Sequence, residues 1–144
     1  MMIKKAQRSD IQDLVRLGVK LWPDHEVDEM AGEFEAFLKN EDTALFLALE
    51  GESVGFAQCQ LRRDYVEGTG TSPVGYLEGI FVEEAYRNRG CARDLLKACE
   101  AWVKEKGCAE FASDCELGND TSLAFHLSVG FEEANRIICF TKKL

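Results

Sequence analysis

The sequence lacks the features that mark several common protein classes. No apolar run approaches the roughly 20 residues of a membrane-spanning helix, and no leader of the secretory kind precedes the first expected strand. The six cysteines form no C-x-x-C pair, and the chain has only two histidines. We therefore expect no membrane segment, no signal peptide, no structural zinc site, and reduced, mostly buried thiols in a cytoplasmic protein.

Basic residues are also scarce. The chain has 17 Lys and Arg against 26 Asp and Glu, which gives a formal net charge of −9. This balance disfavours a nucleic-acid-binding protein, which would show a basic face. It is compatible with an acidic cleft that attracts a cationic substrate, although solubility alone could also explain it.

The glycine-rich signatures of dinucleotide-binding and P-loop proteins are absent, yet one stretch predicts a phosphate site. Residues 76–82 are mostly apolar or aromatic, as in a strand, and a basic turn follows at 87–92. A helix then begins at Gly90 and ends at Gly107, with one apolar stripe: Ala92, Leu95, Leu96, Cys99, Trp102 and Val103. Free N–H groups and the helix dipole at such a junction favour bound phosphate.

The other patterns predict one domain over residues 1–144, with no internal repeat or linker. Strands are expected at 2–7, 44–50, 54–61, 108–114 and, as a last strand or hairpin, 132–142. Helical stripes cover 11–22, with Ser9 as the expected N-cap, and also 27–38 and 121–129. The resulting order β-α-α-β-β-β-α-β-α-β is that of an α/β protein with helices on the faces of a mixed sheet.

Two carboxylates lie at positions where the local secondary-structure pattern does not explain a charged side chain. Glu78 lies inside an apolar strand, where period-two alternation places it on one face with Tyr76 and Ile80. A carboxylate buried there is costly unless it meets a cation or water, so we favour a functional role over a strand-edge residue paired to an arginine. Asp114 ends the neighbouring strand, where it serves either a substrate or a turn.

The basic turn resembles the R/Q-x-x-G-x-G/A pyrophosphate turn of the GCN5-related N-acetyltransferase (GNAT) superfamily, with Arg87, Gly90 and Ala92 at the motif positions. Asn119-x-x-Ser122-x-x-x-His126-x-x-x-Gly130-Phe131 resembles the late N-x-x-A-x-x-x-Y-x-x-x-G-F segment of the same superfamily. His126 replaces the usual Tyr, a common general acid to the CoA thiolate. The resemblance implies the GNAT fold, a single mixed, mostly antiparallel sheet flanked by helices.

The same resemblance implies acetyl-CoA as co-substrate and no metal. Backbone N–H groups at 80–82 would polarise the thioester carbonyl, and the basic turn would bind the diphosphate. The residues implied in cofactor binding are Ile80, Phe81, Val82, Arg87, Asn88, Arg89, Gly90, Cys91, Ala92, Asn119 and His126.

Four longer segments (21–25, 62–69, 71–82 and 111–114) are similar to the chromosomal aminoglycoside 6′-N-acetyltransferases of Gram-negative bacteria. This implies acetyl transfer to the 6′-amine of kanamycin- or tobramycin-type antibiotics, drug resistance, and a homodimer. Trp22 is then expected near the drug, although its place on an apolar stripe also suits a core residue. Tyr65, on the loop before the central strand, either walls the drug site or is an ordinary loop aromatic.

The expected mechanism is direct attack of the amine on the thioester in a ternary complex. Glu78 or Asp114 is the expected base, and His126 either protonates the CoA thiolate or fills the position. No cysteine is expected to act as nucleophile. Alternatives are an acetyltransferase of another polycationic amine or of a protein N-terminus, and a domain that binds acyl-CoA without transfer.

Overall fold

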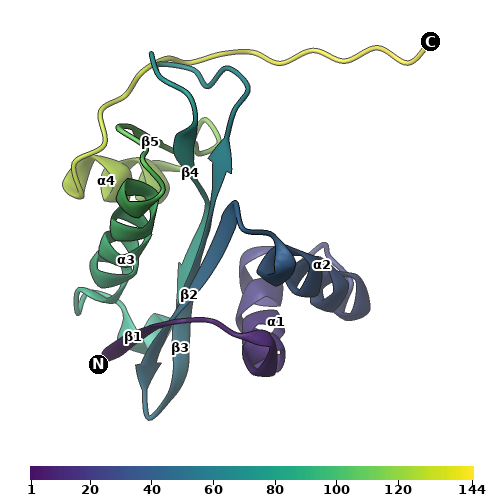
Figure 1. Cartoon of the computed structure of the whole chain (residues 1–144), viewed down its shortest axis with the longest axis vertical. Coiled ribbons are helices and arrows are strands. Elements are labelled where there is room, and N and C mark those ends of the chain that lie inside the picture. Colours follow the sequence, from purple (N-terminus) through teal and green to yellow (C-terminus); the bar gives the residue numbers. More distant parts are fainter.

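A computed structural model describes all residues from 1 to 144 and shows a five-stranded sheet with helices on both faces (Figure 1). The strands, in their spatial order, are β1 (Met2–Lys5), β2 (Thr43–Glu50), β3 (Glu52–Arg62), β4 (Val74–Val82) and β5 (Phe111–Ala112). The pairs from β1 to β4 are antiparallel, and β5 is parallel to β4. The helices are α1 (Ile11–Leu21), α2 (Val27–Lys39), α3 (Cys91–Glu105) and α4 (Asp120–Ser128), with 3₁₀ turns η1 (Arg8–Asp10) and η2 (Glu84–Tyr86).

The two faces of the sheet have separate apolar cores. α1 and α2 cover one face, and α3 with α4 lies on the other (Figure 1). Alternation along β3 supplies both: Phe56 packs with Leu14 and Phe34 under α1 and α2, whereas Ala57 and Cys59 pack under α3. Burial on both faces explains the almost continuous apolar sequence of β2 and β3.

A bulge in the central strand changes the face on which its residues lie. Consecutive β3 residues Gln58 and Cys59 pair with Gly79 and Leu77, so Glu78 is an extra residue on β4. Strict alternation predicted that Glu78 and Ile80 share a face, and this was wrong. Ile80 packs against the α3 core, because the bulge shifts the alternation after Glu78.

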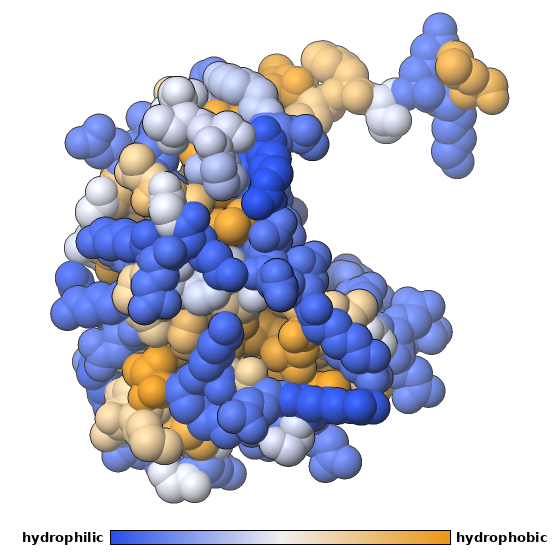
Figure 2. Space-filling view, viewed as in Figure 1, coloured by the Kyte–Doolittle hydropathy of each residue, from blue (hydrophilic) through white to orange (hydrophobic).

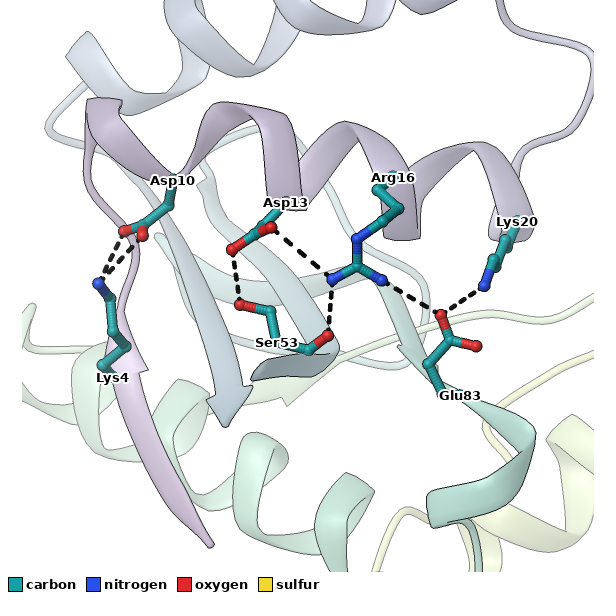
Figure 3. Close-up of polar contacts among 7 residues, drawn as sticks. All are labelled: Lys4, Asp10, Asp13, Arg16, Lys20, Ser53 and Glu83. Carbon is teal, nitrogen blue, oxygen red and sulfur yellow. Dashed lines mark hydrogen bonds and ion pairs between the residues drawn. The ribbon is translucent and has the colours of Figure 1, made fainter. Parts of the chain in front are cut away.

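Polar contacts fix α1 against the ends of β3 and β4 (Figure 3). Ser53 Oγ donates to Asp13 at 2.9 Å, and Arg16 Nη2 donates to the Ser53 carbonyl at 2.8 Å. Glu83, directly after β4, accepts Lys20 at 2.5 Å and lies 3.5 Å from Arg16. These contacts set the position of the helix whose C-terminal end carries Trp22.

Three predictions of local structure were wrong or assigned too many residues to a strand. Gln7 and Asp10 form the capping box of η1, so Ser9 is not the cap of a helix that starts there. The strand expected at 108–114 is only Phe111–Ala112. Residues 132–142 form no strand: the C-terminal segment leaves the body of the molecule in an extended conformation, because it has no neighbouring strand within this chain (Figure 1).

The cysteines are all unpaired. Four are buried as expected, but Cys115 and Cys139 are exposed. No three side chains of the His, Cys, Asp and Glu types gather as metal ligands would. Every helix is too short or too polar to span a bilayer.

Candidate active site

The turn before α3 has the geometry of an anion site. Gly90 is the N-cap of α3 with φ of +82°, and Asn88 is also left-handed, with φ of +62°. This conformation turns the chain sharply into the helix and suits glycine, because it has no Cβ. The N–H groups of Asn88, Arg89 and Gly90 donate to no backbone carbonyl, and a Cβ on Gly90 would meet no atom within 4 Å. A phosphate can therefore approach these amides directly.

The basic side chains of the turn have different settings. Arg87 Nε donates to the Val82 carbonyl at 2.8 Å, which ties the turn to the end of β4. Arg89 is exposed and lies over the ring of Tyr86. Cys91 and Leu95 are buried and anchor the first turn of α3 in the core. The turn is thus a fixed structure that leaves Arg89 available to an anion.

The second half of β4 has a free edge. β4 and β5 pair only at Gly75 with Phe111 and at Tyr76 with Ala112. Beyond these pairs the edge that faces β5 has no strand partner, and it carries Ile80, Phe81 and Val82 towards the turn. A free strand edge can bind an extended, amide-bearing chain through backbone hydrogen bonds. The CoA pantetheine arm is such a chain, so the residues present fit acetyl-CoA.

Glu78 lies in a cluster on the opposite face from α3. Its Oε1 accepts hydrogen bonds from Gln60 Nε2 at 2.6 Å and from Arg62 Nη2 at 2.6 Å and Nε at 3.1 Å. The Arg62 guanidinium stacks 3.5 Å above the ring of Tyr76, whose hydroxyl donates to Asp114 Oδ2. The structure therefore brings the two predicted carboxylates into one cluster through Arg62 and Tyr76.

The cluster is short of positive charge. Arg62 offsets one of the two carboxylates, so the group retains a net negative charge. Burial, followed by the hydrogen bond and charge of Asp114, raises the pKa of Tyr76 well above its usual value, so the phenol stays protonated. Figure 2 shows a hollow between α2 and the end of the sheet over which the C-terminal segment passes. Hydrophilic residues border the hollow, and hydrophobic residues lie deeper in it.

His126 lies on α4 and has both ring nitrogens in contact with the chain. Nδ1 is 2.7 Å from the Ser122 carbonyl oxygen, and Nε2 is 2.8 Å from Ser113 Oγ. Because a carbonyl only accepts, Nδ1 carries a hydrogen, and Nε2 of the neutral ring accepts from the serine hydroxyl. Asn119 caps the same helix through its Oδ1, which accepts from the Ser122 N–H at 3.2 Å.

The two aromatic candidates for the acceptor site differ. Trp22 packs so closely on β4 that a Cβ added to Gly79, next to Glu78, would lie 2.6 Å from its ring. Its ring also packs edge-on against Phe56, so it is part of the core as well as a neighbour of the cluster. Tyr65 is 77% exposed on the loop after β3, and its hydroxyl makes no hydrogen bond in this chain.

Four residues of the site were missed by the sequence predictions: Gln60, Arg62, Tyr76 and Ser113. Arg62 and Ser113 stand in segments singled out for their resemblance to a subgroup, and Tyr76 was expected on the face of Glu78. Alternation along β3 carried a further signal, because polar Gln58, Gln60 and Arg62 alternate with buried Cys59 and Leu61. What no pattern gave is the strand register that places Arg62 against Glu78.

This sheet, with an anion-binding turn after its central strand and a free strand edge beside it, defines the class of acyl-CoA-dependent N-acyltransferases. The sequence profile of the acetyltransferase (GNAT) family matches residues 8–131. The chain belongs to the GNAT family.

Relatives within the family match over nearly their whole length. The chain is 40% identical over 144 residues to the aminoglycoside N(6′)-acetyltransferase type 1 of Stenotrophomonas maltophilia. This match covers 99% of this chain and 93% of the relative. It is 39% identical over 142 residues to the protein of the same name from Salmonella typhimurium strain LT2, covering 98% of each.

Solved structures agree with the fold. AAC(6′)-Iy in complex with the bisubstrate analogue CoA-S-monomethyl-acetylneamine matches with a TM-score of 0.96 at 37% identity, covering 99% of this chain and 98% of that one. Ligand-free AAC(6′)-IG from Acinetobacter haemolyticus matches with a TM-score of 0.95 at 37% identity, covering 100% and 99%. The predicted fold and superfamily are confirmed.

Proposed function

We propose that the chain is an aminoglycoside 6′-N-acetyltransferase, which transfers acetyl from acetyl-CoA to the 6′-amine of kanamycin- and tobramycin-type antibiotics and so confers resistance. The observation that carries this is the cluster of Glu78 and Asp114, whose negative charge Arg62 only partly offsets. Glu78 lies on β4, the strand that leads towards the turn before α3, and Asp114 follows β5. An aminoglycoside presents several ammonium groups and supplies the missing positive charge. Relatives of that name, 37–40% identical along the whole chain, give independent support.

Acetyl-CoA supplies an activated acyl group whose carbonyl carbon accepts the amine. The amides of Asn88, Arg89 and Gly90, with the N-terminal turn of α3 from Cys91 and Ala92, would hold its diphosphate. Residues 80–82 would hold its pantetheine arm along the free edge of β4, where a backbone N–H can polarise the thioester carbonyl. Holding amine and thioester together provides much of the acceleration.

The proton on the attacking nitrogen must leave, because an ammonium is not a nucleophile. Glu78 is already paired with Arg62, whereas Asp114 receives only the neutral hydroxyl of Tyr76. We therefore assign Asp114 as the group that takes the proton, directly or through one water, and Glu78 as a ligand of a neighbouring ammonium. Trp22 would pack against the sugar ring of the acceptor, and Tyr65 would close over it from the loop.

His126 is assigned to the thiolate. Ser113 Oγ lies 3.5 Å from the Leu77 carbonyl, so the Ser113–His126 pair faces the gap where β4 and β5 separate. An imidazolium would donate from Nε2, and Ser113 could pass a proton on to sulfur. In His126→Ala we expect slower CoA release at acid to neutral pH, followed with a thiol reagent, and a smaller difference from the parent at alkaline pH, because only a protonated imidazole can act as the acid. Unchanged turnover across the pH range would remove His126 as the acid.

A single assay tests the proposed activity. Purified protein is mixed with acetyl-CoA and kanamycin A, tobramycin, spermidine or a peptide with a free N-terminus, and thiol release is followed. We expect turnover with the two drugs and none with a matched aminoglycoside that carries a hydroxyl in place of the 6′-amine. Turnover confined to spermidine or the peptide would replace the proposed acceptor. Acetyl-CoA binding without any turnover would make the chain a sensor.

We also propose that the enzyme is a homodimer in which the C-terminal segment of one copy packs on the other. Beyond Arg136 the segment makes no hydrogen bond with its own chain, and Ile137, Ile138 and Phe140 are 66%, 81% and 91% exposed. A hollow beside β5, lined by Val103, Phe111, Val129 and Phe131, offers apolar surface at an open sheet edge. Sedimentation should give a dimer for the full chain and a monomer after truncation at residue 136; a monomeric full chain would contradict the proposal.

The expected compartment is the cytoplasm, where acetyl-CoA is available. Six unpaired cysteines suit a reducing environment. Cell fractionation tests this: activity in a periplasmic extract alone would contradict it.

A further inference from the structure

We propose that Tyr76 is a positioning residue for the transfer reaction, whose hydroxyl holds Asp114 in the orientation in which its other oxygen meets the attacking amine. The inference rests on the proposed function and adds a residue to it. Tyr76 does not touch the reacting atoms in this scheme: it acts through Asp114.

The ring of Tyr76 has no freedom to turn. It is 7% exposed and packs in a small apolar cluster with Val66, Val74 and Ala112, between β4 and β5. The Arg62 guanidinium covers one ring face at 3.5 Å. Because the ring plane is fixed by packing on both sides, the direction of its hydroxyl is fixed as well.

Asp114 has no such support of its own. It lies beyond the end of β5, in an exposed segment without regular structure, and its side chain makes no ion pair. The hydroxyl of Tyr76 is its single protein donor, on Oδ2. An exposed aspartate on a loop would otherwise sample several rotamers, and each wrong one would lower the fraction of productive complexes.

Tyr76 remains a donor over the working pH range. Burial raises its pKa, and Asp114 and Glu78 raise it further, while Arg62 alone among the facing groups lowers it. The net direction is upward, so the phenol keeps its proton wherever the enzyme operates. Tyr76→Phe removes this donor and leaves the packed ring in place. The carboxylate it exposes is already solvated, so the variant is expected to fold.

The test is a double-mutant cycle with kanamycin A as acceptor. Tyr76→Phe should lower kcat about tenfold and leave the KM for acetyl-CoA unchanged. In an Asp114→Asn background the same change should alter kcat by less than about twofold, because the group that Tyr76 orients is already gone. Equal losses in both backgrounds, or no loss in Tyr76→Phe alone, would overturn the proposal.

Thr71→Val is the matched control. Thr71 lies on the exposed loop before β4, and its hydroxyl donates to the Glu110 carboxylate at Oε1. The variant therefore also removes a hydroxyl that donates to a carboxylate. The control should retain full kcat. A tenfold loss there would mean that any hydroxyl lost near β5 slows the enzyme, and the assignment to Tyr76 would fail.

A second measurement does not depend on acetyl transfer. In protein labelled with ¹³C at the tyrosine ring, the Tyr76 signal should stay that of a phenol to a higher pH than the ring of a free tyrosine, because the pKa of Tyr76 is raised. Asp114→Asn should bring its titration to lower pH, because the carboxylate that raises its pKa is removed. If Tyr76 titrates like a free tyrosine in the parent protein, the hydrogen bond is absent and the positioning role is wrong. If the bond is present but no aminoglycoside is acetylated, the proposed function alone fails.

Discussion

Two glutamates at the central strand have similar burial and different surroundings. Glu78 lies at the bulge of β4 with a side chain 20% exposed, and Glu83, directly after β4, is 22% exposed. Glu83 pairs with Lys20 and Arg16, and with Asp13 these groups balance in charge (Figure 3). Around Glu78 and Asp114, Arg62 leaves one negative charge unpaired. The unbalanced group is where an external cation gains most by binding.

The two glutamates also connect different pairs of secondary-structure elements. Glu83 connects α1 to the end of β4, elements that are far apart in the sequence, so it contributes to helix docking. Glu78 connects β4 to β3, strands already held together by their backbone ladder. Removing Glu83 should therefore cost stability, and removing Glu78 should cost function.

The largest expected effect is that of Asp114→Asn. The change removes the proposed proton acceptor and keeps the shape of the side chain, so kcat for kanamycin A should fall by a factor of about 100 or more. The melting temperature should be unchanged, because Asp114 is exposed and makes no ion pair. Steady-state kinetics and differential scanning fluorimetry provide the measurements.

Glu83→Gln is the control for this comparison and should keep kcat within about twofold of the parent. If Asp114→Asn were as active as Glu83→Gln, the functional half of the comparison would be lost.

Gly90→Ala should weaken acetyl-CoA binding about tenfold, the next effect in size. The added Cβ meets no protein atom, yet it projects into the space above the free amides and disfavours φ of +82°. Isothermal titration calorimetry with CoA gives the change.

Gly107→Ala carries the same backbone strain at the other end of α3, with φ of +87° and open space. We expect a similar loss of stability there and no change in affinity for CoA. Equal weakening in both variants would assign the effect to strain in α3 and remove the turn as the diphosphate site.

Glu83→Gln should lower the free energy of unfolding by about 1 kcal/mol, because two partly exposed ion pairs are lost. Glu78→Gln should lower it by less than half as much. Urea denaturation measures both, and the difference should shrink in 1 M salt, which screens the pairs. A greater loss in Glu78→Gln would reverse the comparison.

The smallest effect concerns the thiols. Burial raises the pKa of Cys91 and Cys108, and a hydrogen bond with Cys59 together with burial raises that of Cys99, so these groups form little thiolate at pH 8. A thiol reagent should therefore modify the exposed Cys115 in the folded protein and all six cysteines in denaturant.

Cys115→Ala should retain full kcat, since the proposed mechanism uses no cysteine. An acetyl group trapped on Cys115 by mass spectrometry would contradict direct transfer.

Much of the fold was predictable because its signals are local. The stripes of α1, α2 and α3 and the apolar runs of β2 to β4 predicted those elements to within a few residues. The region from 108 to the end was predicted less well, because a strand exists only with a partner. β5 pairs with β4 over two residues, and 132–142 has no partner within the chain. Both failures concern the edge of the sheet.

The site divides in the same way. The turn at Gly90 follows from a strand, a basic stretch and a helix in direct succession, so it was predicted with its residues. Glu78 was predicted as a site residue because it is a carboxylate inside an apolar strand, and Asp114 because it ends the neighbouring expected strand. Their connection through Arg62 and Tyr76 was not predicted, because it depends on how β3 and β5 align with β4.

The sequence by itself determined the four helices and strands β2 to β4 to within a few residues, the place of the helix-opening glycine, and the negative charge of the chain. Hydrophobic period, turn chemistry and net charge are properties of neighbouring residues, so they need no knowledge of the fold. The tertiary structure alone decided that Glu78 is a bulge, that Ile80 faces α3, and that Tyr76 holds Asp114. One extra residue in a strand reverses every side chain after it, and such a shift depends on the pairing of distant strands.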